Sequence, residues 1–276
     1  MNKNFIQRTV AGAVLVILIL SSIWFSKYGF FVLFCIISAL LTAEFHKLTN
    51  RSDVFVPYIV AVCASVVLFA AFFLYFAGFE VPFYKYIFIL YAVIVLGFFL
   101  YELFKKSENP INNLAYFVLG QVYIALPLSL LNGILFYNDV WTPVFLIALF
   151  VTIWLNDTCA YLVGSKFGKH SLFKRVSPKK SWEGFIGGAF GALLSGCLFY
   201  CVVPIHSLWF WLIFVEIVVV FGTFGDLLES LLKRTVGVKD SGHIIPGHGG
   251  MLDRFDSLLL SSPIIYLYMY MYLIFV

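Results

Sequence analysis

The sequence predicts an all-α polytopic membrane protein with about nine transmembrane helices. The first observation behind this class is composition, because 62% of the 276 residues are hydrophobic and only 12% are charged, whereas a soluble domain has about 25% charged residues. The second is a succession of apolar stretches close to the roughly 20 residues that a membrane span needs. The third is the placement of basic residues, which alternates from one connection to the next.

Nine stretches are apolar and long enough to be spans, and short polar or turn-forming segments such as SKYG, HKLTNRSD and YNDVWTP separate them. The stretches cover residues 8–25, 29–45, 55–78, 82–104, 114–136, 141–163, 184–203, 207–228 and 255–276.

The distribution of lysine and arginine supports this number of spans. The N-terminus and every second connection after it carry 16 of the 18 basic residues, and the opposite side carries only Lys27 and Lys85. A wrong number of spans would scramble this asymmetry, because basic residues gather on the cytoplasmic side of a membrane. We therefore expect the N-terminus in the cytoplasm and the C-terminus outside.

The chain is expected to divide by role. Residues 1–150 offer little beyond hydropathy and are interpreted as N-terminal transmembrane helices that form a scaffold and give access to lipid. Residues 151–276 are interpreted as the catalytic region, with cytoplasmic loops over 164–183 and 229–254. Basic loops that only orient helices would explain the positive charge there, but not the carboxylates among it. These are Asp226, Glu229, Asp240, Asp253 and Asp256.

The stretch GDLLESLLKR, residues 225–234, predicts a polar helix face at the end of the eighth span. If it is helical, Asp226, Glu229, Ser230 and Lys233 lie at positions i, i+3, i+4 and i+7, on one side. A carboxylate so close to an apolar span is costly. A hard cation would offset that cost, because Mg²⁺ prefers carboxylate oxygens and substrate phosphates.

The ninth span begins with LDRFDS, in which Asp253 and Asp256 lie three residues apart in the first helical turn. Acidic side chains are favoured there, so plain N-capping accounts for one of them. The preceding PGHGG supplies Gly249 and Gly250, whose backbone N–H groups are suited to approach phosphate at a helix N-terminus. We interpret His248 as a phosphate contact or as part of the loop structure, not as a base.

The sixth span ends in NDTCAY, where Asp157 and Tyr161 lie four residues apart. This pattern indicates either a wet cavity that opens to the cytoplasm or a hydrogen bond between helices. Lys179 and Lys180 follow in SPKKSWEG and are candidates for binding phosphate. Basic residues beside a membrane also attract anionic lipid, so that alternative stays open.

Two further groups of residues carry structural expectations. The glycines of the seventh span recur at four-residue spacing, which predicts close helix packing. They are Gly184, Gly187, Gly188 and Gly191. Glu44 and Glu102 lie near the cytoplasmic ends of their spans and are expected to reach water there.

Paired carboxylates, several basic residues and a glycine-rich turn, all expected at the cytoplasmic membrane face, are the components of phosphoryl or nucleotidyl transfer. The run over residues 230–256 then resembles the signature of the phosphatidate cytidylyltransferases, also called CDP-diacylglycerol synthases. The matching fixed positions are Ser230, Lys233, Arg234, Lys239, Asp240, Gly242, Pro246, His248, Gly249, Gly250, Asp253, Arg254 and Asp256. NDTCAY and SPKKSWEG are also similar to the family, whereas Ser165 stands where the family pattern has arginine.

The resemblance implies that CTP and phosphatidic acid react to CDP-diacylglycerol and pyrophosphate at the cytoplasmic face of a cell inner (plasma) membrane. It implies Mg²⁺ held by Asp226 and Asp253, with K⁺ beside it, and a homodimer among membrane lipids; no nucleic-acid partner is expected. The catalytic residues it implies are Asp226, Asp253, Lys233, Lys239 and Asp256. The substrate-binding residues that we expect are Arg234, Arg254, His248, Gly249, Gly250, Lys179, Lys180, Ser230 and Asp157.

Three other functions stay open at this point. A CTP-dependent lipid kinase of the polyprenol or phytol type would release CDP instead of pyrophosphate. A transporter would use Glu216 and Asp157 to line a path, although the paired halves or broken helices typical of transporters are not evident. A non-catalytic membrane scaffold would tolerate the loss of Asp226 or Asp253.

Overall fold

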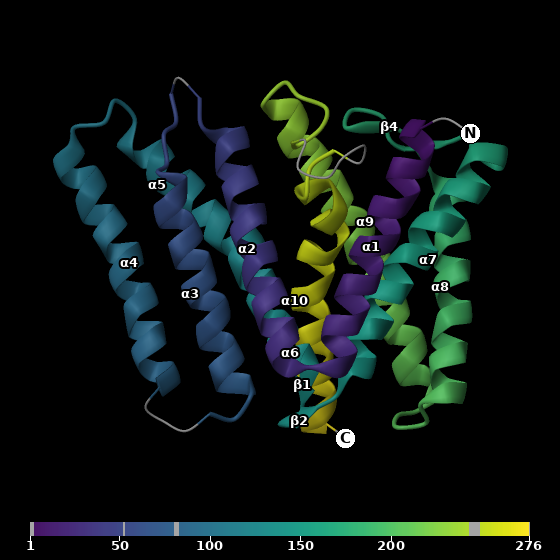
Figure 1. Ribbon diagram of the computed structural model, residues 1–276. Coiled ribbons are helices and arrows are strands. Elements are labelled where there is room, and N and C mark those ends of the chain that lie inside the picture. Colours follow the sequence, from purple (N-terminus) through teal and green to yellow (C-terminus); the bar gives the residue numbers. More distant parts are fainter. Residues whose placement is uncertain (1–2, 52, 80–82, 243–248, 276) are drawn as a thin grey trace. The chain divides into compact units, whose positions relative to one another are not determined.

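The computed structural model describes residues 3–51, 53–79, 83–242 and 249–275 of the chain (Figure 1). The chain divides into two compact units. Unit 1 consists of Met1–Pro143 and Asp240–Arg254, and unit 2 consists of Val144–Lys239 and Phe255–Val276. The predicted boundary at residue 150 lies near the change after Pro143, but the segment 240–254 groups with the N-terminal helices.

The described residues form helices that match the nine predicted spans. Eight of these helical stretches are long and apolar enough to cross a membrane, and Val10–Phe25 is a shorter apolar one. The all-α polytopic class is therefore confirmed. The helices are α1 (Lys3–Phe25), α2 (Lys27–Thr49), α3 (Tyr58–Phe76), α4 (Phe83–Lys105), α5 (Pro110–Gly120), α6 (Leu126–Leu135), α7 (Pro143–Phe167), α8 (Trp182–Val202), α9 (Leu208–Thr235) and α10 (Leu252–Phe275).

In unit 1, α3 packs against α2, α4 and α6. Ala61 and Ala64 of α3 belong to one apolar cluster with Phe98 of α4 and Phe117 of α5. The rings of Phe98 and Phe117 are stacked, with centroids 4.3 Å apart. Between α2 and α3, the hydroxyl of Thr42 donates a hydrogen bond to Ser65 Oγ at 3.0 Å. The hydrogen bond between these hydroxyls offsets the cost of removing them from water. A short hairpin of β1 (Phe136–Tyr137) and β2 (Val140–Trp141) follows α6.

The fifth predicted span is interrupted by one turn of wider helix, η1 (Gln121–Ala125), which joins α5 to α6. Pro127 explains this interruption, because proline has no N–H for the carbonyl four residues earlier and its ring crowds that carbonyl. Tyr123 is that residue, and it lies inside η1. A π-type turn relieves the crowding without ending the span.

In unit 2, close helix contacts confirm the predicted role of the α8 glycines. A Cβ atom at Gly188 would lie 2.3 Å from Asn156 Oδ1, and one at Gly191 would lie 2.5 Å from Cys159 Sγ, both on α7. The backbone of α7 is close as well, since a Cβ atom at Gly184 would lie 2.9 Å from the Ala160 carbonyl oxygen. Glycine therefore allows the close packing of α7 and α8. Further along the unit, α8 packs against α9, and Tyr268 of α10 donates a hydrogen bond to the Phe210 carbonyl of α9 at 3.1 Å.

The two long connections are more ordered than the sequence predicts. Within 164–183, α7 continues to Phe167, and β3 (Ser171–Phe173) pairs antiparallel with β4 (Ser177–Ser181). Within 229–254, α9 continues to Thr235, so the start of the expected loop is helix. The helix stops after Thr235, and Gly237, just beyond its end, has a φ of +71° that suits glycine. The Val238 N–H donates to the Lys233 carbonyl at 2.9 Å, as is usual at such a helix end.

Candidate functional site

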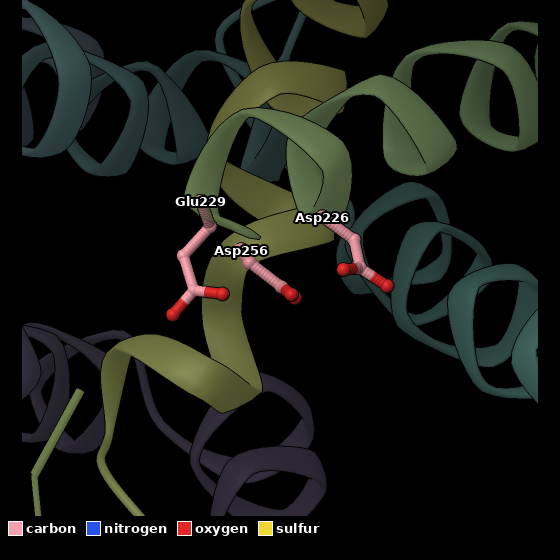
Figure 2. Close-up of side chains that lie close together, drawn as sticks. All are labelled: Asp226, Glu229 and Asp256. Atoms are coloured by element: carbon pink, nitrogen blue, oxygen red, sulfur yellow. The ribbon is translucent and has the colours of Figure 1, made fainter. Parts of the chain in front are cut away.

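Three carboxyl groups of unit 2 lie close together. Asp226 and Glu229 come from α9, and Asp256 comes from α10; one oxygen of each lies within 4.8 Å of the others. Figure 2 shows the three side chains reaching toward the same side of the two helices. Such a group of carboxylate oxygens is the ligand set that a hard cation such as Mg²⁺ prefers.

The predicted polar face of α9 is confirmed. Ser230 Oγ donates to Asp226 Oδ1 at 3.3 Å, and Lys233 Nζ lies 2.5 Å from Glu229 Oε2. Both pairs are four residues apart, which puts their members one above the other on the helix. Glu229 is fully buried and Lys233 is 9% exposed.

Gly225 explains how α9 and α10 come close enough to form the cluster. A Cβ atom at this position would lie 2.4 Å from the Asp256 backbone oxygen and 3.2 Å from Ser257 Cα. A side chain on residue 225 would therefore push apart the helices that carry Asp226 and Asp256. The glycine directly before Asp226 in the sequence sets the distance between the two carboxylates.

Two lysines offset part of the repulsion within the cluster. Two unit charges about 4 Å apart repel by about 4 kcal/mol in partly buried surroundings. Lys180 forms an ion pair with Asp226, and Lys233 forms one with Glu229. Within the described part of the chain, no basic side chain is found paired with Asp256, whose Oδ1 accepts the Ser257 N–H at 2.6 Å. The cluster therefore retains a demand for positive charge.

A cavity of about 460 Å³ lies in unit 2 beside this cluster and includes Asp226 in its wall. It brings together predicted substrate-binding residues from separate segments, namely Asp157 of α7 and Lys179 and Lys180 of β4. Asp157 is exposed in the wall of this cavity. The rest of the lining is Asn156, Ala160, Tyr161, Gly164, Ser165, Leu172, Ser181, Gly184, Phe185 and Thr223.

The β3–β4 hairpin holds the two lysines at this cavity, and Glu183 anchors its base. The Glu183 carboxylate accepts the Lys169 N–H at 3.1 Å and lies 2.7 Å from His170 Nδ1. Ser181 caps α8 by accepting the Gly184 N–H at 3.1 Å. The end of β4 and the start of α8 are therefore fixed together, which limits where Lys180 can lie.

Asp253, the other predicted metal ligand, belongs to unit 1. Its Oδ2 accepts hydrogen bonds from the Ser241 N–H at 3.1 Å, the Ser241 hydroxyl at 3.0 Å and the Gly250 N–H at 2.9 Å. The Gly250 N–H is thus engaged within the protein, although the sequence analysis expected it to face phosphate. Gly249 has a φ of +82°, a conformation that favours glycine. His248 lies outside the described residues.

The remaining predicted residues lie at the ends of α9 and α10. Arg234 is exposed, and its guanidinium donates to the Val238 carbonyl at 3.2 Å. Lys239 is exposed just after α9, and Arg254 is exposed in the first turn of α10. Their phosphate contacts stay predictions.

The expectation that Glu44 and Glu102 reach water is wrong. They are 4% and 2% exposed, respectively. Glu102 accepts a hydrogen bond from Asn113 Nδ2 at 2.9 Å, and Glu44 accepts from the segment before α10. Sequence position placed them correctly near helix ends but could not show that other segments cover them. Glu229 was also not selected as a ligand, although its spacing of three from Asp226 was the available signal.

In a comparison with known proteins, the sequence profile of the cytidylyltransferase family matches residues 6–272. The chain belongs to the cytidylyltransferase family. The match includes the acidic cluster, the cavity wall and the Asp253 segment, so the family covers both units.

Curated relatives of this cytidylyltransferase-family chain carry the name phosphatidate cytidylyltransferase. One from Staphylococcus saprophyticus is 47% identical over 117 residues, which are 42% of this chain and 45% of the relative. One from Staphylococcus aureus (strain COL) is 38% identical and one from Staphylococcus epidermidis is 34% identical, each over 168 residues, or 60% of this chain. These alignments cover 62% of each relative, so the chain spans less than two thirds of the curated relatives it matches.

Proposed function

We propose that the protein is a phosphatidate cytidylyltransferase that transfers the cytidylyl group of CTP to phosphatidic acid. The observation that carries the proposal is the carboxylate cluster of Asp226, Glu229 and Asp256 beside a cavity that also holds Lys179 and Lys180. The relatives' name gives the substrates. The site supplies the means to bind two polyanions next to each other.

In the proposed reaction, a phosphate oxygen of phosphatidic acid attacks the α-phosphorus of CTP in line with the leaving group. A new P–O bond forms, the bond from the α-phosphorus to the oxygen that bridges to the β-phosphate breaks, and pyrophosphate leaves with that electron pair. A phosphate monoester has its second pKa near 6, so the attacking oxygen is largely ionised at neutral pH. The reaction therefore needs positioning and charge neutralisation more than it needs a general base.

The chain's own residues divide this work. Lys180 is held at the cavity wall by its ion pair with Asp226, where an ammonium group can neutralise a phosphate oxygen. Lys179 adds a second cation on the same strand. Lys233, Arg234, Lys239 and Arg254 remain the proposed contacts of pyrophosphate or the lipid phosphate.

Mg²⁺ is the proposed cofactor, with K⁺ beside it. Asp226, Glu229 and Asp256 fit such a group, because three oxygen donors from two helices converge and the nearby lysines offset only part of their charge. When bound, Mg²⁺ would neutralise the triphosphate and stabilise the departing charge. The pairing of Asp226 with Asp253 as ligands stays a prediction from the family signature.

We further propose that the site faces the cytoplasm from the inner membrane and that the protein acts as a homodimer. The distribution of basic residues, 16 against 2, supports the cytoplasmic side. A soluble nucleotide would then enter from the cytoplasm and a lipid phosphate from the inner leaflet.

The test is to incubate the purified protein in detergent with phosphatidic acid, Mg²⁺ and CTP labelled at the α-phosphate. A cytidylyltransferase puts the label into lipid and releases pyrophosphate. A CTP-dependent lipid kinase leaves the α-label in soluble CDP, and that result would contradict the proposal. Because detergent provides no sealed compartment, turnover also separates an enzyme from a transporter.

Asp226→Asn and Asp253→Asn test the site in the same assay. Each variant should lose at least about 99% of the activity while it still inserts and folds, since removal of one electrostatic partner typically costs 10²–10³ in rate. A scaffold without catalysis would put no label into lipid in any form, the wild-type protein included. Full activity in both variants would refute the assignment of these residues.

A further inference from the structure

Glu44 of α2 has a hydrogen-bonding pattern unlike that of an ordinary carboxylate at a helix end. It is 4% exposed, and it accepts the Met251 N–H at 2.7 Å and the Leu252 N–H at 3.3 Å. The Ser241 hydroxyl also lies within hydrogen-bonding distance of it, and its single proton is shared between Glu44 and Asp253. All three donors come from a segment about 200 residues later in the chain, and all belong to unit 1.

These contacts place the Glu44 carboxylate against the backbone at the start of α10. The first N–H groups of a helix have no partner within the helix and need an acceptor from elsewhere. Glu44 provides that acceptor for Met251 and Leu252. Hydrogen bonds between backbone N–H groups and a carboxylate are shorter and about twice as strong as neutral ones, so they fix the backbone of this segment firmly.

Ser241 connects Glu44 to Asp253. Its hydroxyl lies within hydrogen-bonding distance of both Glu44 Oε1 and Asp253 Oδ2, the latter at 3.0 Å. Gly250 adds a second connection, because its N–H donates to Asp253 Oδ2 while the next two N–H groups donate to Glu44. The position of the Asp253 carboxylate therefore depends on Glu44 through two short paths.

The glycines of this segment fit the same explanation. A Cβ atom at Gly250 would lie 1.8 Å from Glu44 Oε1 and 2.0 Å from Ser241 Oγ. A Cβ atom at Gly242 would lie 3.1 Å from Glu44 Cδ. Both positions lack a side chain where the Glu44 carboxylate occupies the space, so these glycines admit a buried glutamate from another helix.

We propose that Glu44 is a positioning residue that sets the orientation of Asp253, because its hydrogen bonds fix the positions of Ser241 and residues 250–252. This inference deepens the proposed function and rests on it for its catalytic consequence. Glu44 does not itself touch substrate in this role. Its effect is to pre-organise a carboxylate that does.

Glu44→Ala is the principal test, with Glu102→Ala as the matched control. Both residues are glutamates of unit 1, near helix ends and almost fully buried, but Glu102 bonds to Asn113 and not to the segment before α10. A misplacement of about 1 Å can cost about 100-fold in rate. We therefore expect Glu44→Ala to lower kcat about 100-fold with little change in KM for CTP or phosphatidic acid, and Glu102→Ala to lower kcat far less.

Amide hydrogen exchange provides a readout that does not depend on catalysis. The peptide covering residues 249–258 should lose protection in Glu44→Ala and keep it in Glu102→Ala, measured in the same detergent without nucleotide. Wild-type exchange of this peptide in folded Glu44→Ala would overturn the proposal, and so would an equal loss of kcat in both variants. Because exchange needs no substrate, this outcome is distinct from failure of the wild-type protein to make CDP-diacylglycerol.

Ser241→Ala keeps the test decisive if Glu44→Ala does not fold. This change removes the bridging hydroxyl and leaves the glutamate in place. It should lower kcat about tenfold and partly deprotect residues 249–258, because one charge-assisted hydrogen bond is lost. Unchanged kcat and unchanged protection in Ser241→Ala would show that the link from Glu44 to Asp253 does not act.

Discussion

Gly225→Ala should disable the carboxylate cluster without altering any charged group. The new Cβ atom would lie 2.4 Å from the Asp256 backbone oxygen, about 1 Å short of ordinary contact, and 3.2 Å from Ser257 Cα. Backbone atoms cannot turn aside as a flexible side chain can, so α9 and α10 must separate. Asp226 moves with one helix and Asp256 with the other.

The magnitude follows from this displacement. Overpacking of this kind costs about 1–3 kcal/mol of stability. A shift of about 1 Å between catalytic groups costs about 100-fold in rate. We expect Gly225→Ala to fold with a lower Tm and to retain about 1% of the wild-type transfer of labelled CTP into lipid, with a weaker rise of Tm on addition of Mg²⁺.

Gly222→Ala is the matched control, because it adds the same methyl group one turn earlier on α9. Its Cβ atom would lie 3.5 Å from Ser257 Cβ, which is an ordinary contact. Alanine is also the better helix former by about 1 kcal/mol. This variant should keep wild-type activity and stability. Equal losses in both variants, or full activity in Gly225→Ala, would refute the argument that this contact sets the carboxylate spacing.

Two further changes test the packing and the charge balance. Lys233→Met should lower the free energy of unfolding by about 3–5 kcal/mol, because it removes the ammonium group paired with the fully buried Glu229. The double variant with Glu229→Gln should recover much of that loss, as measured by thermal unfolding. Gly188→Ala should lower stability by about 1–3 kcal/mol because its Cβ atom would lie 2.3 Å from Asn156 Oδ1. Gly97→Ala, which has nothing within 4 Å of its added Cβ atom, should leave the Tm unchanged or raise it.

Much of the fold could be predicted because hydropathy and helical spacing are local properties. Apolar length gave the spans, and the four-residue spacing of Gly184, Gly188 and their neighbours correctly indicated helix packing. Positions i, i+3, i+4 and i+7 placed Asp226, Glu229 and Lys233 on one face, since the period of a helix does not depend on its surroundings. The hairpin of β3 and β4 was missed, because SLF and SPKKS are short and lack the alternation that predicts strands.

The sequence by itself determined the class of protein, the number of spans and the residue types that carry chemistry, because each follows from composition or from neighbours in the chain. Only the tertiary structure decided which of those residues meet. The close contact of the two helices at Gly225 brings Asp256 near Asp226. Glu44 accepts a hydrogen bond from the Met251 N–H and does not lie in water. Both results depend on the approach of helices far apart in sequence, and that approach is fixed by the shape of packed side chains and by hydrogen bonds across the fold.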